Sequence, residues 1–151
     1  LVNNAALNYY VPIEDYKINR WVKCFEINVH APFVLSQAVL TDMTGGGSGG
    51  RGGAIVNISG VIAEQNLPGM AAYGASKAAV KSFDEALARE ARRSKIRVID
   101  ARPPHTETGM ADRPIEGTSP KMPEGLTPAH VASVICDALE SGAKDLPSSA
   151  F

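Results

Sequence analysis

The sequence has little cysteine and no arrangement of residues that indicates a metal centre. Its 151 residues include two cysteines and three histidines. Cys24 and Cys136 are far apart, so neither their number nor their spacing indicates a disulfide framework or a zinc site. The histidines also lack metal-ligand spacing, and we expect no bound metal. Two isolated thiols favour a reducing, cytoplasmic setting.

Charge and hydrophobicity argue against two further classes of partner. The formal net charge is −1 and the sequence pI is about 6.3, which leaves no basic footprint for nucleic acid. The longest apolar runs fall short of the ~18–20 residues that cross a membrane, and the chain does not open with a targeting segment. We therefore predict a protein that binds neither nucleic acid nor membrane. A chain of 151 residues with 44% hydrophobic content is expected to form one globular domain over residues 1–151.

What the sequence does contain is an alternation of helical and strand patterns. Residues 54–59 and 97–101 are short apolar runs with β-branched residues, which predict buried strands. Helical periodicity covers four stretches, residues 13–28, 31–43, 72–93 and 128–141. Thr127 suits the N-cap of the last helix, Gly142 ends it, and residues 145–151 are expected to begin an edge strand. The alternation predicts an α/β fold, a Rossmann-like doubly wound parallel sheet with right-handed crossovers.

Residues 45–53, with the sequence GGGSGGRGG, form a low-complexity segment. Gly45, Gly47 and Gly50 satisfy the pattern G-x-G-x-x-G of a phosphate-binding loop. Such a loop follows a strand and opens a helix, whereas this segment follows a predicted helix and precedes a predicted strand. We therefore interpret residues 45–53 as a flexible connector.

Tyr73 and Lys77 are the strongest candidates for catalytic residues. They are four residues apart on the predicted helix 72–93, so they share one face of it. The helix follows the strand 54–59, and α/β folds place their chemistry at the carboxyl ends of parallel strands. A phenol beside an ammonium at that place indicates proton transfer. Most such pairs on helices are solvated or packing residues, so the spacing alone leaves both interpretations open.

Several segments resemble the short-chain dehydrogenase/reductase family. Tyr73-Gly-Ala-Ser-Lys77, preceded by Ile-Val-Asn-Ile-Ser, resembles the active-site segment of that family. Asn3-Asn4-Ala5-Ala6 is similar to its Asn-Asn-Ala-Gly turn, and Asn28 stands where the family has a helix-breaking asparagine. Residues 103–108 resemble its Pro-Gly-x-x-x-Thr segment. The four stretches follow the order of the family and together cover most of the chain.

This resemblance implies an oxidoreductase that interconverts a small carbonyl and an alcohol, with NAD or NADP as the hydride carrier. Tyr73 would exchange the proton, and Lys77 and the oxidised ring would lower its pKa. Lys77 would also bind the nicotinamide ribose, while the backbone carbonyl of Asn28 would hold a water linking Lys77 to solvent. Other cofactor contacts would come from Asn3, Ala5, Pro103, Thr106 and Thr108. The family also suggests homo-oligomers, dimers or tetramers, built on the helix 72–93.

Three positions depart from the family pattern. The substrate-orienting serine of the family lies thirteen residues before the tyrosine, where this chain has Gly60. Ser59 is adjacent, but neighbouring side chains of a strand point to opposite faces, so Ser59 could serve only if the strand has already ended. Ala6 and Pro104 replace glycines. Two alternatives therefore stay open: a catalytically impaired or non-catalytic binding protein on the same scaffold, and a non-redox relative such as a lyase or an epimerase.

The resemblance also implies an incomplete sheet. Residues 1–3 are expected to end a strand that corresponds to the fourth strand of the family fold. The glycine-rich phosphate loop, and the residue that selects NAD or NADP, would then precede Leu1. We therefore expect the C-terminal part of a dinucleotide-binding domain.

Overall fold

The computed structural model describes residues 1–45, 50 and 52–151. Within these residues the chain forms a four-stranded parallel sheet in the order β1-β2-β3-β4. The strands are β1 (Val2–Asn3), β2 (Gly53–Ile58), β3 (Ile96–Ala101) and β4 (Asp145–Leu146). The α-helices are α1 (Ile18–Phe25), α2 (Ala31–Thr44), α3 (Ala71–Ala91) and α4 (Pro128–Ser141). The predicted α/β class with a parallel sheet is confirmed.

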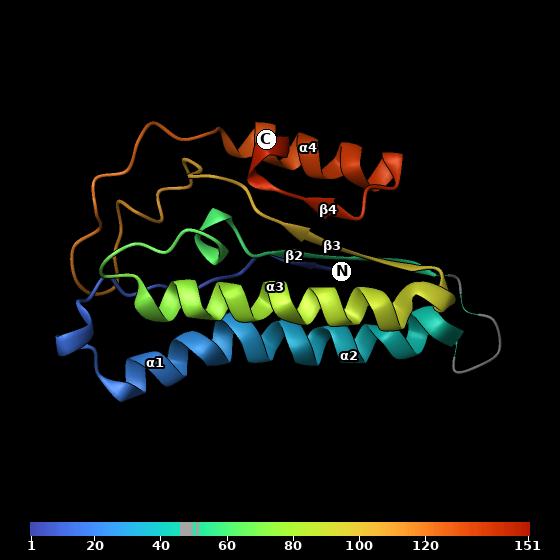
Figure 1. The fold of residues 1–151 in the computed structure, drawn as a ribbon, viewed down its shortest axis with the longest axis horizontal. Helices are drawn as coiled ribbons and strands as arrows, with labels where there is room; N and C mark the ends of the chain where they lie inside the picture. Colours follow the sequence, from blue (N-terminus) through green and yellow to red (C-terminus); the bar gives the residue numbers. More distant parts are fainter. Residues whose placement is uncertain (46–49, 51) are drawn as a thin grey trace.

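Helices cover both faces of the sheet, as a doubly wound fold requires. Figure 1 shows α1, α2 and α3 on one side of the strands and α4 on the other. Ile55 of β2 packs with Leu87 of α3 in one apolar cluster. Its neighbour Val56 packs with Ala138 of α4 in a second cluster, because successive side chains of a strand point to opposite faces.

The position of α4 contradicts the prediction that every crossover is right-handed. Strands β2, β3 and β4 follow one another across the sheet, with α3 between the first two and α4 between the last two. Because α3 and α4 lie on opposite faces, the two crossovers have opposite hands, and one of them has the rare left-handed form. The long connection from Arg102 to Thr127 gives the chain room to change faces before α4 begins.

The N-terminal helices form one long rod with an irregular turn in it. The helix predicted over residues 13–28 begins later, because a separate 3-10 turn occupies Ile13–Asp15 and α1 starts at Ile18. The rod does not end at Asn28 but continues through a π-helical turn, Glu26–His30, into α2. Pro32 has no N–H, so the carbonyl of Asn28 cannot receive the usual helical hydrogen bond from the residue four positions later.

The remaining boundaries agree with the sequence except at the last strand. The Oγ of Thr127 accepts a hydrogen bond from the backbone N–H of His130 at 3.2 Å, and Gly142 ends α4 with φ 80°. The strand β4 is shorter than predicted, because Pro147 has no N–H to continue it and a 3-10 turn follows. Of the predicted connector 45–53, residues 46–49 and 51 lie outside the described residues. Among the described helices, none is long and apolar enough to cross a membrane.

Candidate active site

The first three strands end at the same edge of the sheet, because all are parallel. Their last residues are Asn3, Ile58 and Ala101, and the segments that leave them carry the candidate residues. Helix α3 begins just after the loop that follows β2, so its first turns lie near this edge. The fold therefore brings the predicted Tyr–Lys pair, the Asn3–Ala6 turn and the segment 103–108 to one side of the molecule.

Lys77 is buried beneath the ring of Tyr73. Its Nζ lies 5.6 Å from the centroid of the Tyr73 ring and donates a hydrogen bond to the carbonyl oxygen of Ile58 at 2.6 Å. Only 4% of Lys77 is exposed. Burial lowers the pKa of Lys77 to about 8, although Cys24 and Asp100 partly oppose this shift. Lys77 is therefore still mostly a cation at neutral pH.

Burial has the opposite effect on the phenol of Tyr73. The ring packs against a buried cluster of Tyr10, Ile62 and Met70. Burial raises the pKa of Tyr73 well above its ordinary value, and Tyr10 and Cys24 raise it further. Lys77 alone thus does not produce the lowered pKa expected from the sequence. In this environment Tyr73 is a protonated phenol, which is the form that donates a proton.

Asn28 connects the loop after β1 to the helix that carries the pair. Its side-chain amide donates to the carbonyl oxygen of Leu7 and to Oγ of Ser76, both at 2.9 Å. Its Oδ1 accepts from the N–H of Leu7 at 2.8 Å, and Ser76 in turn donates to the carbonyl oxygen of Tyr73 at 2.7 Å. The side chain of Asn28 therefore fixes the first turns of α3. Ser76 was not predicted as a site residue, although it lies inside the Tyr-x-x-x-Lys segment.

The structure gives no support to the predicted catalytic role of Ser59. Its hydroxyl is fully buried and donates to the carboxylate of Asp100. Gly60 has φ 78° and ψ 162°, a conformation that other residues rarely adopt. A Cβ there would meet the nearest atoms, of Pro103 and Ile62, at 3.8 and 3.9 Å, which are ordinary van der Waals contacts, so no clash excludes a side chain at this place. The N–H of Gly60 is used within the fold, since it donates to the carbonyl oxygen of Ala101.

The predicted cofactor residues lie around the same edge of the sheet, but some are already hydrogen-bonded within the fold and others are exposed. The side-chain amide of Asn3 donates to Asn57 at 2.6 Å, so it stabilises the sheet, whereas Ala5 is exposed. Pro103 is buried and its carbonyl oxygen accepts from Val61. Farther along that segment the side chain of Thr106 donates to the carbonyl oxygen of Pro104 at 3.0 Å, and Thr108 is exposed.

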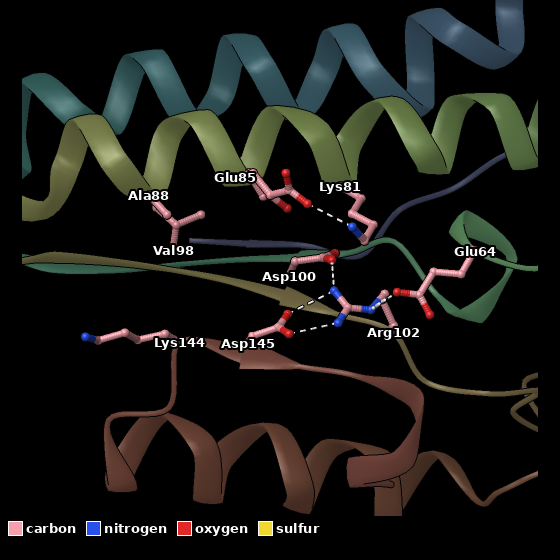
Figure 2. Close-up of a pocket in the computed structure, with 10 residues that line it drawn as sticks. Glu64, Lys81, Glu85, Ala88, Val98, Asp100, Arg102, Lys144 and Asp145 are labelled. Carbon is pink, nitrogen blue, oxygen red and sulfur yellow. Dashed lines mark hydrogen bonds and ion pairs between the residues drawn. The ribbon is translucent and has the colours of Figure 1, made fainter.

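A charged cluster beside β3 and β4 was missed from the sequence. Asp100 and Arg102 point to the α3 face, like Val98, and Asp145 of β4 joins them (Figure 2). They line a cavity of about 240 Å³ between α3 and the last two strands. A signal was present, because two charges separated by one residue at the end of an apolar strand share a face. Tyr73 does not line this cavity, so the cluster is separate from the proton-transfer pair.

Comparison with known proteins agrees with this geometry. A family model described as short chain dehydrogenase matches residues 1–117. The chain belongs to the short-chain dehydrogenase family. The match covers the Asn3–Ala6 turn, the Tyr73–Lys77 segment and residues 103–108, so the resemblance drawn from those segments is confirmed.

Individual members of the short-chain dehydrogenase family cover different parts of the chain. Cyclopentanol dehydrogenase of Comamonas sp. (strain NCIMB 9872) is 36% identical over 113 residues, which are 75% of this chain and 44% of that protein. Dehydrogenase/reductase SDR family member 7B of Mus musculus is 28% identical over 153 residues, covering 97% of this chain and 46% of its own length. The chain thus spans less than half the length of these relatives.

Solved structures of the family match the fold closely. A short chain dehydrogenase from Burkholderia cenocepacia J2315 in complex with NADP has a TM-score of 0.81 at 26% identity, over 98% of this chain and 60% of that chain. A gluconate 5-dehydrogenase from the same organism in complex with NADP and tartrate has a TM-score of 0.68 at 29% identity, over 73% of this chain and 42% of that chain.

Proposed function

We propose that this chain carries the proton-transfer half of an NAD(P)-dependent oxidoreductase that interconverts a small carbonyl and an alcohol. Tyr73 is the proposed proton donor and acceptor. The observation that supports this most directly is the buried Lys77 ammonium 5.6 Å from the Tyr73 ring centroid, at the edge where three parallel strands end. Membership of the short-chain dehydrogenase family and the NADP-bound relatives support the cofactor class.

The residues around the pair fit the nicotinamide side of such a cofactor. Lys77 has three N–H donors, and the hydrogen bond to Ile58 uses one of them among the described residues. The other donors are available for the hydroxyls of a ribose. Gly60 carries no side chain and that of Ala5 is small and exposed, so neither residue obstructs the same edge. We propose that Asn3, Ala5, Pro103, Thr106 and Thr108 line this side of the cofactor.

In the proposed reaction, Tyr73 gives its phenolic proton to the carbonyl oxygen as hydride is added to the carbonyl carbon. NAD(P)H supplies that hydride when bound. Lys77 stabilises the phenolate that is left, because its ammonium stays close to the ring. The carbonyl of Asn28, which receives no bond from Pro32, is the proposed holder of a water that returns a proton to the pair.

Gly60 supports a second candidate function, a binding protein with impaired or no catalysis. One missing hydrogen bond to a developing alkoxide costs on the order of 10²-fold in rate. Ser59 does not replace it, because its hydroxyl is bonded to Asp100. Gly60→Ser would supply the missing hydroxyl, but it is a weak test of this function, since φ 78° imposes strain of about 1–3 kcal/mol on a serine.

The direct experiment measures NAD(P)H turnover by the full protein with a panel of small ketones and alcohols. We expect Tyr73→Phe to lower the rate by about 10²-fold or more, because the proton donor is lost. Tyr16→Phe is the matched control, since the Tyr16 hydroxyl is also buried and has no hydrogen-bond partner among the described residues. If the Tyr73→Phe protein keeps the full rate, Tyr73 is not the acid. If no carbonyl is reduced but dinucleotide binds, the binding-protein function is favoured.

The remaining properties of the protein follow from the same proposal. The substrate class is a small carbonyl or alcohol, and no nucleic acid or membrane partner is proposed. Both cysteines are free thiols, Cys24 buried and Cys136 exposed, which suits a reducing cytoplasmic setting. We also propose that the protein is a homo-oligomer.

A further inference from the structure

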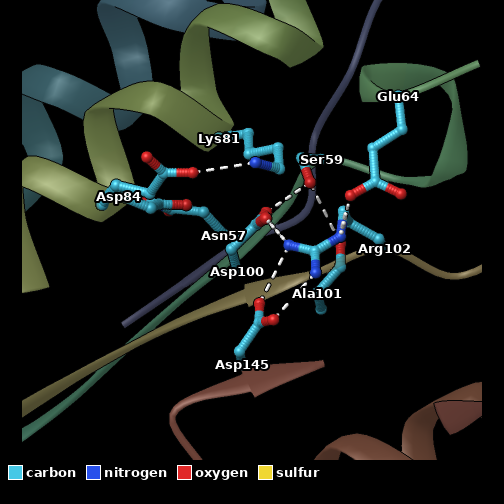
Figure 3. Close-up of polar contacts among 10 residues, drawn as sticks. Asn57, Ser59, Glu64, Lys81, Asp84, Asp100, Ala101, Arg102 and Asp145 are labelled. Carbon is cyan, nitrogen blue, oxygen red and sulfur yellow. Dashed lines mark hydrogen bonds and ion pairs between the residues drawn. The ribbon is translucent and has the colours of Figure 1, made fainter. Parts of the chain in front are cut away.

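Arg102 is a buried cation that joins three segments of the chain. Its guanidinium donates a hydrogen bond to Asp100 on β3. It also forms a bidentate contact with Asp145 on β4, in which both hydrogen bonds are 2.9 Å long. Its Nε also lies 2.9 Å from Oε1 of Glu64, in the loop after β2 (Figure 3). We call these four residues the Arg102 cluster. Only 7% of the Arg102 side chain is exposed, so its contacts are weakly screened.

The contact with Glu64 differs in kind from the other two. It is an ion pair without an aligned hydrogen bond, because Nε of Arg102 has no hydrogen-bond partner among the described residues. The Glu64 side chain is also 37% exposed, whereas the Asp100 side chain is 8% exposed. The Asp145 side chain is 56% exposed but forms two hydrogen bonds, so Glu64 is the member of the cluster that is held by charge alone. The hydrogen bond to Asp145 raises the pKa of Arg102, and so do its contacts with Asp100, so the guanidinium stays charged.

The segment that Glu64 anchors lies against the proposed proton donor. A 3-10 turn, Val61–Ala63, immediately precedes Glu64. At its start, the N–H of Val61 donates to the carbonyl oxygen of Pro103 at 3.0 Å. From the middle of the turn, Ile62 packs in the cluster that contacts Tyr73. The turn is therefore held at both ends by the chain that leaves β3, and its central side chain belongs to the apolar cluster against which Tyr73 packs.

We infer that Arg102 is a positioning residue, which sets Ile62 against Tyr73 through its ion pair with Glu64. This inference rests on the proposed function for its effect on rate, but the ion pair and the packing do not depend on it. Gly60 stands directly before the turn with φ 78°, and its N–H donates to the carbonyl oxygen of Ala101. Without the ion pair, the turn would be joined to the exit of β3 by backbone hydrogen bonds alone.

The alternative is that the cluster only stabilises the fold. The chain offers a matched pair of variants that separates the two possibilities. Glu64→Gln and Glu85→Gln both neutralise a partly exposed glutamate that lines the same cavity. Glu85 pairs with Lys81 at 2.8 Å on α3 and does not pair with Arg102. Each glutamate is exposed enough that its loss leaves the protein folded, which Arg102 substitutions would not guarantee.

The experiment measures kcat and KM for carbonyl reduction and amide hydrogen exchange in the full protein. For Glu64→Gln we expect kcat to fall about three- to tenfold, while KM changes by no more than about twofold. The reason is that a shift of the turn would displace Tyr73, and the position of a proton donor matters most in the transition state. Amides of residues 61–66 should exchange at least about threefold faster. Glu85→Gln should change neither quantity.

Two results would overturn the inference. The first is the same behaviour in both variants, which would make Glu64 an ordinary surface charge. The second is faster exchange throughout the Glu64→Gln protein, which would mean that the cluster supports general stability only. If the unmodified protein reduces no carbonyl, the proposed function fails, and the exchange of residues 61–66 still decides whether Glu64 anchors the turn.

Discussion

Lys77 is the residue whose charge changes nearest to neutral pH in the proposed reaction. Burial lowers its pKa to about 8, and its ammonium is the group that stabilises the phenolate of Tyr73. We therefore expect kcat/KM for carbonyl reduction to fall as pH rises through about 8, where Lys77 loses its proton. Initial rates between pH 6 and 10 measure this. A rate that stays level above pH 9 would show that the charge of Lys77 is not required.

Asp84 gives a second pH effect, on stability rather than on rate. It is 2% exposed, and burial raises its pKa to about 7, with Asn57 opposing and Asp100 adding to the shift. The folded state therefore holds a proton that the unfolded state has already lost above the ordinary pKa of 3.8. The free energy of unfolding should fall by on the order of 2–4 kcal/mol as pH rises from about 4 to 7, and change no further from this group above that.

The variant Asp84→Asn tests this linkage, because an amide keeps an oxygen to accept from Asn57 and cannot ionise. Denaturant unfolding at pH 5 and pH 8 should show a smaller difference in the variant than in the unmodified protein. The variant should also be the more stable of the two at pH 8. Asp137→Asn, on the exposed side of α4, is the control and should leave the difference unchanged.

At the scale of elements, the π-helical turn Glu26–His30 lies where the sequence predicted an irregularity, at Asn28 just before Pro32. The periodicity predicted helix on both sides of that point, and the structure has a continuous rod in which Pro32 removes one helical hydrogen bond. A π-helical turn in such a place is often associated with function. Here it directs the amide of Asn28 toward Leu7 and Ser76.

Replacing Pro32 by alanine should separate the stability of the rod from the function of the turn. Alanine supplies an N–H for the carbonyl of Asn28, so we expect thermal stability to stay the same or rise while the rate of carbonyl reduction falls several-fold. Circular dichroism melts and initial rates measure the two effects. Pro128→Ala is the control, because Pro128 stands at the first position of α4, where an N–H has no helical partner. A Pro32→Ala protein with an unchanged rate would count against the proposed role of the Asn28 carbonyl.

At the scale of the whole molecule, the outer surface of α1 and α2 is unusually apolar. Phe33, Val34 and Leu35 of α2 are 48%, 56% and 47% exposed, and Ile18 of α1 is 76% exposed. A hollow of about 480 Å³ lies beside them, lined by Val29, His30, Phe33, Val34, Val80 and Phe83. Val22 of α1 is also 46% exposed, while Cys24 and Asn28 face the core. Patches of this kind mark contact surfaces.

The family resemblance suggests an interface on the helix 72–93, whereas this exposed apolar surface lies on α1 and α2, with Val80 and Phe83 of α3 lining the hollow beside it. We expect this surface to join copies of the chain, so a charge placed in it should separate them. Val34→Asp should shift the mass measured by light scattering or sedimentation from an oligomer toward a monomer. Ile115→Asp introduces the same charge at another exposed apolar residue, 66% exposed, and should leave the mass unchanged. A monomeric unmodified protein would contradict the prediction directly.

Most of the fold was predictable from local patterns, and the long-range features were not. The strands, the helix α3 and the ends of α4 follow from periodicity, capping and glycine, because each depends on neighbouring residues. The opposite hands of the two crossovers depend on the path of the connection before α4, which has no local signature. At the site, the family motifs identified Tyr73 and Lys77. For the Arg102 cluster, the spacing of Asp100 and Arg102 places two charges on one face, but Glu64 and Asp145 come from other segments, so spacing in the sequence could not show those two partners.

The passage of α4 to the far side of the sheet also explains why charged side chains gather where they do. A strand in the middle of a parallel sheet has a helix over each side, but among the described residues the helix that packs on β4 is α4, on the side away from α3. A cavity lies on the side of α3, and Arg102 and Asp100 are buried beside it. Asp100, Arg102 and Asp145 occupy that place, so this flank of the sheet is held by ion pairs to one arginine rather than by apolar packing.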